Sequence, residues 1–186
     1  MKRSSDKEQQ PSGVIRQLRP SEELLFRQHL LGLDPQSRRD RFNGVTDDTF
    51  ISRYSSRCFH DGTTVIGFVV DGKVGGAAEL HERPDLAHPT GEIAFSVEKD
   101  FQHHGVGAAL FKRLIESARG YGYERLIVTT HPNNEAMKSL ARRFNAKLSF
   151  EEGETVGLIE LAPAPTEIGA NIASGDFPAS AALASG

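Results

Sequence analysis

The chain has 186 residues, of which 38% are hydrophobic, which is enough for one buried core but too short for two ordinary domains. Its 22 basic and 25 acidic side chains give a net charge of -3, so it lacks the electrostatic footprint of a nucleic-acid-binding protein. The amino terminus is polar, and no apolar run approaches the roughly 20 residues that a membrane span needs. We therefore expect a single-domain cytoplasmic protein that binds neither nucleic acid nor membrane.

Composition divides the chain into three parts. Residues 1–12 are polar and lack periodicity, and residues 162–186 are dominated by Ala, Pro, Ser and Gly. Such segments bury too little apolar surface to fold, which predicts disorder at both ends. The folded domain is expected over residues 13–161, and it contains no internal repeat.

The first part of this domain predicts a strand followed by helices. Residues 14–18 alternate between apolar and polar side chains, as a strand does. A cap and first-turn acids at Pro20-Ser21-Glu22-Glu23 then start a helix that runs to Leu31. Asp34-Pro35 repeats this start signal, and Thr46-Asp47-Asp48 opens a third helical stretch.

The centre of the domain predicts an antiparallel hairpin. Residues 63–70 and 73–81 are apolar runs, and Asp71-Gly72 between them suits a tight turn. A further strand is expected over residues 92–97.

The remaining elements alternate between helices and strands. Residues 106–118 predict a helix, because apolar side chains recur at every fourth position. A strand over 125–130 and a helix over 134–144 follow. A last hairpin is expected from residues 147–150 and 155–161.

The loop between Val97 and Val106 is a candidate anion site. Free backbone N–H groups and the partial positive charge of a helix amino terminus converge there, so a pyrophosphate would fit. Gly105 and Gly107 allow the backbone to approach phosphate oxygens closely. Two glycines alone are equally consistent with an ordinary strand-to-helix turn.

The sequence Gln102-His103-His104-Gly105-Val106-Gly107 resembles the Gln/Arg-x-x-Gly-x-Gly/Ala signature of the GNAT superfamily of N-acyltransferases. The resemblance covers about residues 14–161: residues 92–97 are similar to the family's fourth strand, and residues 134–140 to its last helix. It implies an α/β (α+β) fold with a mixed, largely antiparallel central sheet flanked by helices. A weaker similarity links residues 37–42 to the GNAT modules of bacterial protein-lysine acetyltransferases.

The resemblance also implies acetyl-CoA as the acyl donor. In this family the pantetheine arm of CoA binds exposed backbone of a splayed fourth strand, a loop holds the pyrophosphate, and an asparagine reaches the pantetheine. The residues at these positions, which we expect to bind the cofactor, are Phe95, Ser96, Val97, Gln102, His103, His104, Gly105, Val106, Gly107, Ala108 and Asn134.

A general base is needed because a lysine-like amine, with an ordinary pKa of about 10.4, is protonated at neutral pH. Many family members carry a glutamate at the start of the fourth strand, where this chain has Glu92, our first candidate. Glu79 is the second. Each is also consistent with a solvated carboxylate. A strand N–H near Val97 is expected to stabilise the carbonyl oxygen as it becomes negative.

The usual acid for the leaving thiolate is missing. Many family members supply a tyrosine from the last helix, but Ala141 occupies that position here. Ser139, water or the departing amine proton remain open as sources of this proton.

Other side chains favour structural interpretations. The chain has seven histidines, but they form no recognised ligand pattern, so we expect no metal. The single cysteine, Cys58, excludes an internal disulfide and indicates a small apolar side chain in a reducing compartment. The basic run over residues 37–42 is more typical of a solvated helix face than of a nucleotide or acceptor contact.

The acceptor is the least specified part of the prediction. We expect transfer to a primary amine, either a protein lysine or a small molecule, chosen by the first helices and the loop over residues 81–90. One alternative is a non-catalytic acyl-CoA-binding regulatory module, which Ala141 favours and Glu92 opposes. Another is a different nucleotide-binding α/β fold, against which the hairpin at Asp71-Gly72 argues. Whether the protein forms a homo-oligomer, its acyl-chain preference and the role of the tail stay open.

Overall fold

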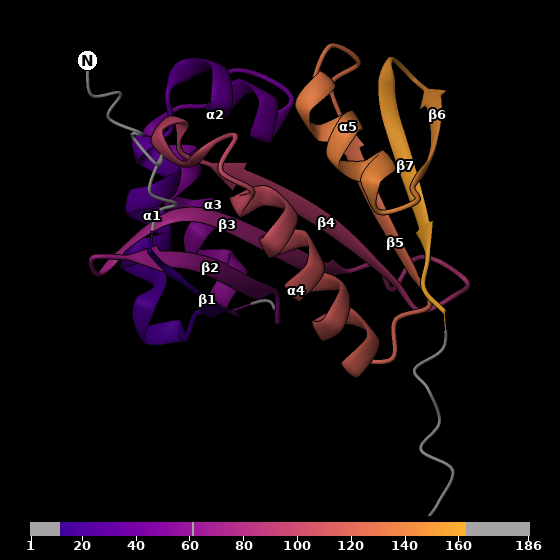
Figure 1. Ribbon diagram of the computed structural model, residues 1–186, viewed down its shortest axis with the longest axis horizontal. Coiled ribbons are helices and arrows are strands. Elements are labelled where there is room, and N and C mark those ends of the chain that lie inside the picture. Colours follow the sequence, from indigo (N-terminus) through magenta and orange to yellow (C-terminus); the bar gives the residue numbers. More distant parts are fainter. Residues whose placement is uncertain (1–11, 61, 163–186) are drawn as a thin grey trace, which may run out of the picture.

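The computed structural model describes residues 12–60 and 62–162 (Figure 1). The strands are β1 (Val14–Gln17), β2 (Thr64–Val70), β3 (Lys73–Glu82), β4 (Thr90–Val97), β5 (Arg125–Thr130), β6 (Lys147–Glu151) and β7 (Glu154–Glu160). The helices are α1 (Glu23–Gly32), α2 (Pro35–Phe42), α3 (Asp48–His60), α4 (Val106–Gly120) and α5 (Glu135–Arg143), with short 3-10 turns η1 (Pro20–Glu22) and η2 (Lys99–Phe101). Apart from Ser12 and Ala162, the ends for which we predicted disorder lie outside the described residues.

All seven strands form one sheet in the order β1-β2-β3-β4-β5-β7-β6. Each neighbouring pair is antiparallel except β4 with β5, which confirms the predicted mixed, largely antiparallel sheet flanked by helices. Local signals act as expected. The Asp34 carboxylate accepts the N–H groups of Gln36 and Ser37 at the start of α2, and Asp71 and Gly72 both take positive φ in the hairpin turn.

Helices cover the two faces of the sheet. On one face, α4 and α5 bury side chains such as Leu110 and Phe111 against Ile93. On the other face, α1 and α3 bury Phe26 and Ile51 against the sheet. Among the residues described, no helix combines the length and apolar character needed to cross a membrane.

The strands β4 and β5 pair only where they begin. Residues 90–92 pair with residues 125–127, and the ladder stops there although the strands continue to Val97 and Thr130. Figure 1 shows the two strands diverging from this point, with the amino end of α4 near the open side. Since β3 pairs with β4 along residues 91–97, the other edge of β4 over residues 93–97 has no strand partner in the described part of the chain.

Candidate functional site

The amino terminus of α4 offers backbone donors to an anion. Gly105, the residue before the helix, has φ 81°, which glycine adopts without strain. The first donor within the helix is the N–H of Ala109, which bonds the Gly105 carbonyl at 3.0 Å, so the N–H groups of residues 106–108 have no partner in the helix. A Cβ built on Gly105 would meet no atom within 4 Å, so the space beside Gly105 is open. This geometry fits a phosphate group.

Side chains of the same loop point in different directions. The Gln102 Nε2 atom donates to the Val97 carbonyl at 2.9 Å and to the Ser37 Oγ at 3.1 Å. Its side chain therefore ties the end of β4 to α2. The Gln102 N–H donates to the Lys99 carbonyl at 3.2 Å, so Gln102 offers no free donor to an anion. His103 is exposed with φ 62°, and His104 is half-buried.

The unpaired edge of β4 presents backbone groups of Phe95 and Val97. The N–H of Glu98 donates to the carbonyl of Gly75 in β3 at 2.9 Å, and backbone groups alternate in direction along a strand. The backbone of Val97, and of Phe95 two residues earlier, therefore points away from β3 and toward the gap. The Phe95 ring stacks on Phe111 in the core at a centroid distance of 4.7 Å. Ser96 directs its backbone at β3.

Two polar side chains lie across the gap. The hydroxyl of Thr130, at the end of β5, is buried and has no hydrogen-bond partner among the residues that the structure describes. Asn134 caps α5 by accepting the Met137 N–H at 2.9 Å, which leaves its amide N–H groups able to donate. A bound amide chain would satisfy both groups. Sequence reasoning missed Thr130, because a threonine at a strand end carries no motif.

Glu92 lies on the sheet face opposite α4. It pairs with His81 of β3 and Ile127 of β5, whose side chains share that face. One oxygen accepts the Arg83 Nη1 at 3.0 Å, and the rest of the Arg83 guanidinium bonds Asp85. The Glu92 side chain is 37% exposed. Arg83 therefore holds the carboxylate in one orientation while leaving it open to a partner from solvent.

Glu79 is fully buried in a polar cluster between β3, α2 and α3. One oxygen accepts the Arg41 guanidinium at 2.7 Å, and the other bonds the Tyr54 hydroxyl and lies 3.2 Å from the His81 Nε2. Burial by itself raises the pKa of the Glu79 carboxyl, but the charge of Arg41 and the hydrogen bond from His81 outweigh burial and lower this pKa to about 2. Glu79 therefore stays ionised, and both its oxygens are occupied.

Arg41 corrects one expectation. We took the basic run over residues 37–42 as a solvated helix face, yet the Arg41 side chain is only 8% exposed. The reason is that α2 turns this residue toward Glu79, a partner 38 positions along the chain.

The same cluster contains a set of possible metal ligands. Atoms of Cys58, Glu79 and His81 lie within 4.8 Å of one another. The neighbouring guanidinium of Arg41 already satisfies the Glu79 charge and repels a cation. Burial and the charge of Glu79 raise the pKa of the Cys58 thiol to about 12, which disfavours the thiolate that binds metals. We assign no metal to this cluster.

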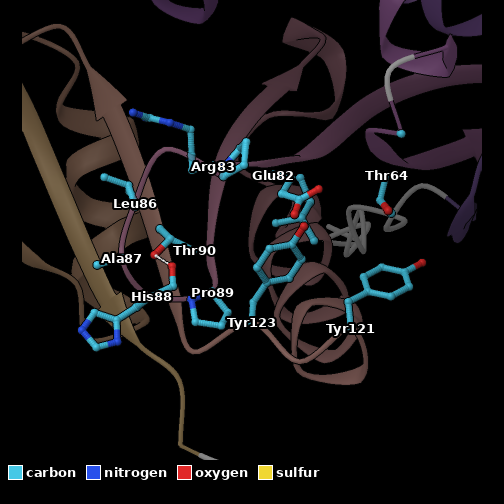
Figure 2. A pocket seen from close by; sticks show the side chains of 13 residues that line it. Thr64, Glu82, Arg83, Leu86, Ala87, His88, Pro89, Thr90, Tyr121 and Tyr123 are labelled. Carbon is cyan, nitrogen blue, oxygen red and sulfur yellow. Dashed lines mark hydrogen bonds between the residues drawn. The ribbon is translucent and has the colours of Figure 1, made fainter.

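An open groove of about 800 Å³ lies at the other end of α4. It is lined by Gly62, Thr64, Leu80, Glu82, Arg83, Pro84, Leu86, Ala87, His88, Pro89, Thr90, Tyr121 and Tyr123. Figure 2 shows the Tyr123 ring pointing toward Glu82, Tyr121 farther to one side, and the Arg83 side chain extending away from both tyrosines. Most of the loop that we expected to choose the acceptor lines this groove, whereas Glu92 lies outside it.

Comparison with known proteins points to one family. The family model described as acetyltransferase (GNAT) family matches residues 30–146. Among solved structures, the chain is similar to the GNAT domain of S. lividans PAT, with a TM-score of 0.69 and 19% identity over 80% of this chain and 90% of that chain.

Two similar structures contain the cofactor. One is yncA, a putative acetyltransferase from Salmonella typhimurium with acetyl-CoA, with a TM-score of 0.62 and 17% identity over 82% of this chain and 96% of that chain. The other is a phosphinothricin acetyltransferase from Sinorhizobium meliloti in complex with AcCoA, with a TM-score of 0.59 and 13% identity over 83% of this chain and 94% of that chain. At these identities the structural matches establish the fold.

Proposed function

Since this chain belongs to the GNAT acetyltransferase family, whose members carry out acetyl-CoA-dependent acetylation, we propose that it acetylates a primary amine, in the first place a lysine side chain of a protein. The observation that carries the proposal is the parting of β4 and β5 beside the amino terminus of α4. At this parting, one ligand could place an anionic group at the amino terminus of α4 and hydrogen-bond to the unpaired edge of β4.

The residues around the parting fit acetyl-CoA, which supplies the acetyl group as a thioester. The N–H groups of residues 106–108 would hold its pyrophosphate. The backbone of Phe95 would bond an amide of its pantetheine arm. The Val97 carbonyl already accepts the Gln102 Nε2, and the Val97 N–H stays available for the acetyl carbonyl. Thr130, whose buried hydroxyl lacks a partner among the described residues, and Asn134 would complete the polar contacts from the other side.

The same edge supports the chemistry of transfer. Glu92, partly exposed, would take the proton of the acceptor ammonium, and the Val97 N–H would stabilise the carbonyl oxygen as it becomes negative. Both oxygens of Glu79 already accept hydrogen bonds, so Glu79 would not act as the base. It would hold Arg41 and Tyr54 in place beneath the sheet face that carries Glu92. Ala141 is buried, and its side chain has no acidic group that could protonate the CoA thiolate. The thiolate would instead receive its proton from Ser139, from water or from the acceptor amine.

The sheet face that continues from Glu92 supports a polypeptide acceptor. The helices α1, α2 and α3 make their main sheet contacts at β2, β3 and β4. Beyond them, β5 and β7 present half-buried side chains on that face, namely Ile127, Thr129, Val156 and Leu158. The adjoining hairpin carries four glutamates, Glu151, Glu152, Glu154 and Glu160, against one lysine, Lys147. The excess of negative charge favours an acceptor protein whose reactive lysine lies in a cationic segment.

Acceptor-dependent release of CoA tests the proposal. Free thiol would be followed with acetyl-CoA and a panel of lysine peptides with basic neighbours, a polyamine and an amino sugar. We expect the peptides to give the largest kcat/KM. Release with the small amines alone would replace the protein lysine by a small-molecule acceptor. Binding of acetyl-CoA without release by any acceptor would favour the non-catalytic acyl-CoA-binding module.

A glycine substitution tests the anion site separately. Valine at Gly105 would place a branched side chain at positive φ and in front of the free N–H groups of α4. We expect Gly105→Val to raise the KM for acetyl-CoA at least about tenfold, which corresponds to about 1.4 kcal/mol of lost binding. The amine KM should not change.

Gly122→Val is the matched control, because Gly122 has φ +82° and equally open surroundings at the far end of α4. It should carry the same backbone cost without affecting the KM for acetyl-CoA. An equal rise in both variants would argue against phosphate binding at Gly105.

A further inference from the structure

A serine, a histidine and a carboxylate are joined in series at the unpaired part of β4. The His29 Nε2, from α1, lies 2.8 Å from the Ser96 Oγ. The His29 Nδ1 lies 3.1 Å from the Glu98 Oε1, just after β4 ends. The His29 side chain is fully buried, and that of Glu98 is 34% exposed. These contacts have the connectivity of a nucleophile, its base and the carboxylate that orients the base.

Hydrogen-bond roles in this series follow from chemistry. An ionised carboxylate only accepts, so the His29 Nδ1 facing Glu98 carries the proton. In the neutral form of the ring, the Nε2 atom has a lone pair that accepts the Ser96 hydroxyl proton. This arrangement makes the Ser96 oxygen a better nucleophile than an ordinary serine oxygen.

The surroundings of Ser96 suit an acyl group. Phe95 and Val97, its neighbours in the chain, direct their backbone groups into the gap that we propose holds acetyl-CoA. The N–H of Val97, the residue after the serine, is placed as the backbone donor that commonly stabilises the oxyanion next to a nucleophilic serine. The amine reaction through Glu92 makes no use of His29 or Glu98.

We propose that Ser96 accepts the acetyl group from acetyl-CoA when no amine is bound, an inference that rests on the proposed function. The Ser96 oxygen attacks the thioester carbon, its proton passes to the His29 Nε2, the C–S bond breaks, and the thiolate leaves as the free thiol with that proton. Water then hydrolyses the ester, His29 taking the water proton and returning it to Ser96. The net reaction converts acetyl-CoA and water into acetate, free CoA and a proton. Because Ser96 is only 6% exposed, hydrolysis is slow and the ester accumulates.

The experiment is incubation of the full chain with acetyl-CoA without an amine, followed by denaturation and peptide mass spectrometry. The tryptic peptide that contains Ser96 ends at Lys99. Because Lys99 is the only lysine between residues 74 and 99, no lysine inside this peptide competes with Ser96 as the site of acetylation. We expect one acetyl group on Ser96, which hydroxylamine removes because esters, unlike amides, react with it. Ser96→Ala should lose this acetyl group and most amine-independent CoA release while keeping the backbone contacts to acetyl-CoA.

Two further variants separate chemistry from packing. His29→Gln should slow acetylation of Ser96 by about 10²- to 10⁴-fold, the usual contribution of a general base. Where His29→Gln fails to fold, Glu98→Gln, at a partly exposed position, tests the same series and should also slow the reaction. Ser55→Ala is the matched control, since Ser55 is another buried serine, bonded to Glu23, and its loss should leave Ser96 acetylation intact.

Absence of acetyl on Ser96, while amines still provoke CoA release, would overturn the inference and leave the proposed function standing. Unchanged amine-independent release in Ser96→Ala would overturn it as well. Failure of acetyl-CoA to bind at all would remove both proposals together.

Discussion

Glu92→Gln is expected to lower the amine-dependent kcat by about 10²- to 10⁴-fold, the range that a general base contributes. Glutamine keeps the size of the side chain and the hydrogen bond from Arg83, but it cannot take a proton from the acceptor ammonium. The KM for acetyl-CoA should hardly change, because Glu92 lies on the acceptor face and not at the amino end of α4.

The pH dependence of this variant separates a base from a binding group. Without the base, the reaction depends on the small free-base fraction of the amine, which rises tenfold per pH unit below the amine pKa of about 10.4. The kcat/KM of Glu92→Gln should therefore recover as the pH rises toward that value. Glu116→Gln, on the exposed side of α4 beside Arg113, is the control and should behave like the native chain. A native kcat in Glu92→Gln would place the base elsewhere.

Helices and strands could be predicted because their signals are local. The cap at Asp34, the turn at Asp71-Gly72 and the spacing-four pattern of α4 each act within a few residues, so the sequence alone contains them. The strand-to-helix loop that carries the candidate anion site could be predicted for the same reason, since Gly105 and the helix that follows it are contiguous.

The parting of β4 from β5 could not be predicted in this way. Residues 93–97 look like any half-buried strand, and nothing in them records that the parallel ladder ends at Glu92. The partners of the candidate bases were missed for a related reason. Glu79 and Arg41 are 38 positions apart, and Arg83 and Glu92 are joined by a loop whose course no motif describes. Only the resemblance to a family supplied the splayed strand as an expectation.

The ion pair between Arg41 and Glu79 is expected to have the largest effect on stability. Arg41→Met should lower the free energy of unfolding by about 3–5 kcal/mol, because it leaves the buried carboxylate of Glu79 without its cation. Adding Glu79→Gln to Arg41→Met should recover much of this loss, since the unpaired charge is then gone. Arg39→Met, at an exposed position of the same helix, should change the stability by less than about 0.5 kcal/mol. Urea unfolding measures all three.

The pH dependence of the free energy of unfolding tests whether Arg41 stabilises the fold through its charge. The pKa of Glu79 is lowered from its ordinary value of 4.5 to about 2, so its ion pair stabilises the native chain above the ordinary value. That stability is lost as the pH falls through the range between the two values. In Arg41→Met the charge that lowers the Glu79 pKa most is gone, so this pKa rises and protonation relieves the buried charge. The stability difference between the two proteins should therefore shrink as the pH falls from about 7 to about 3. A difference that stays constant over this range would mean that Arg41 stabilises the fold through the packing of its side chain on Phe42 and Tyr54 and not through its charge.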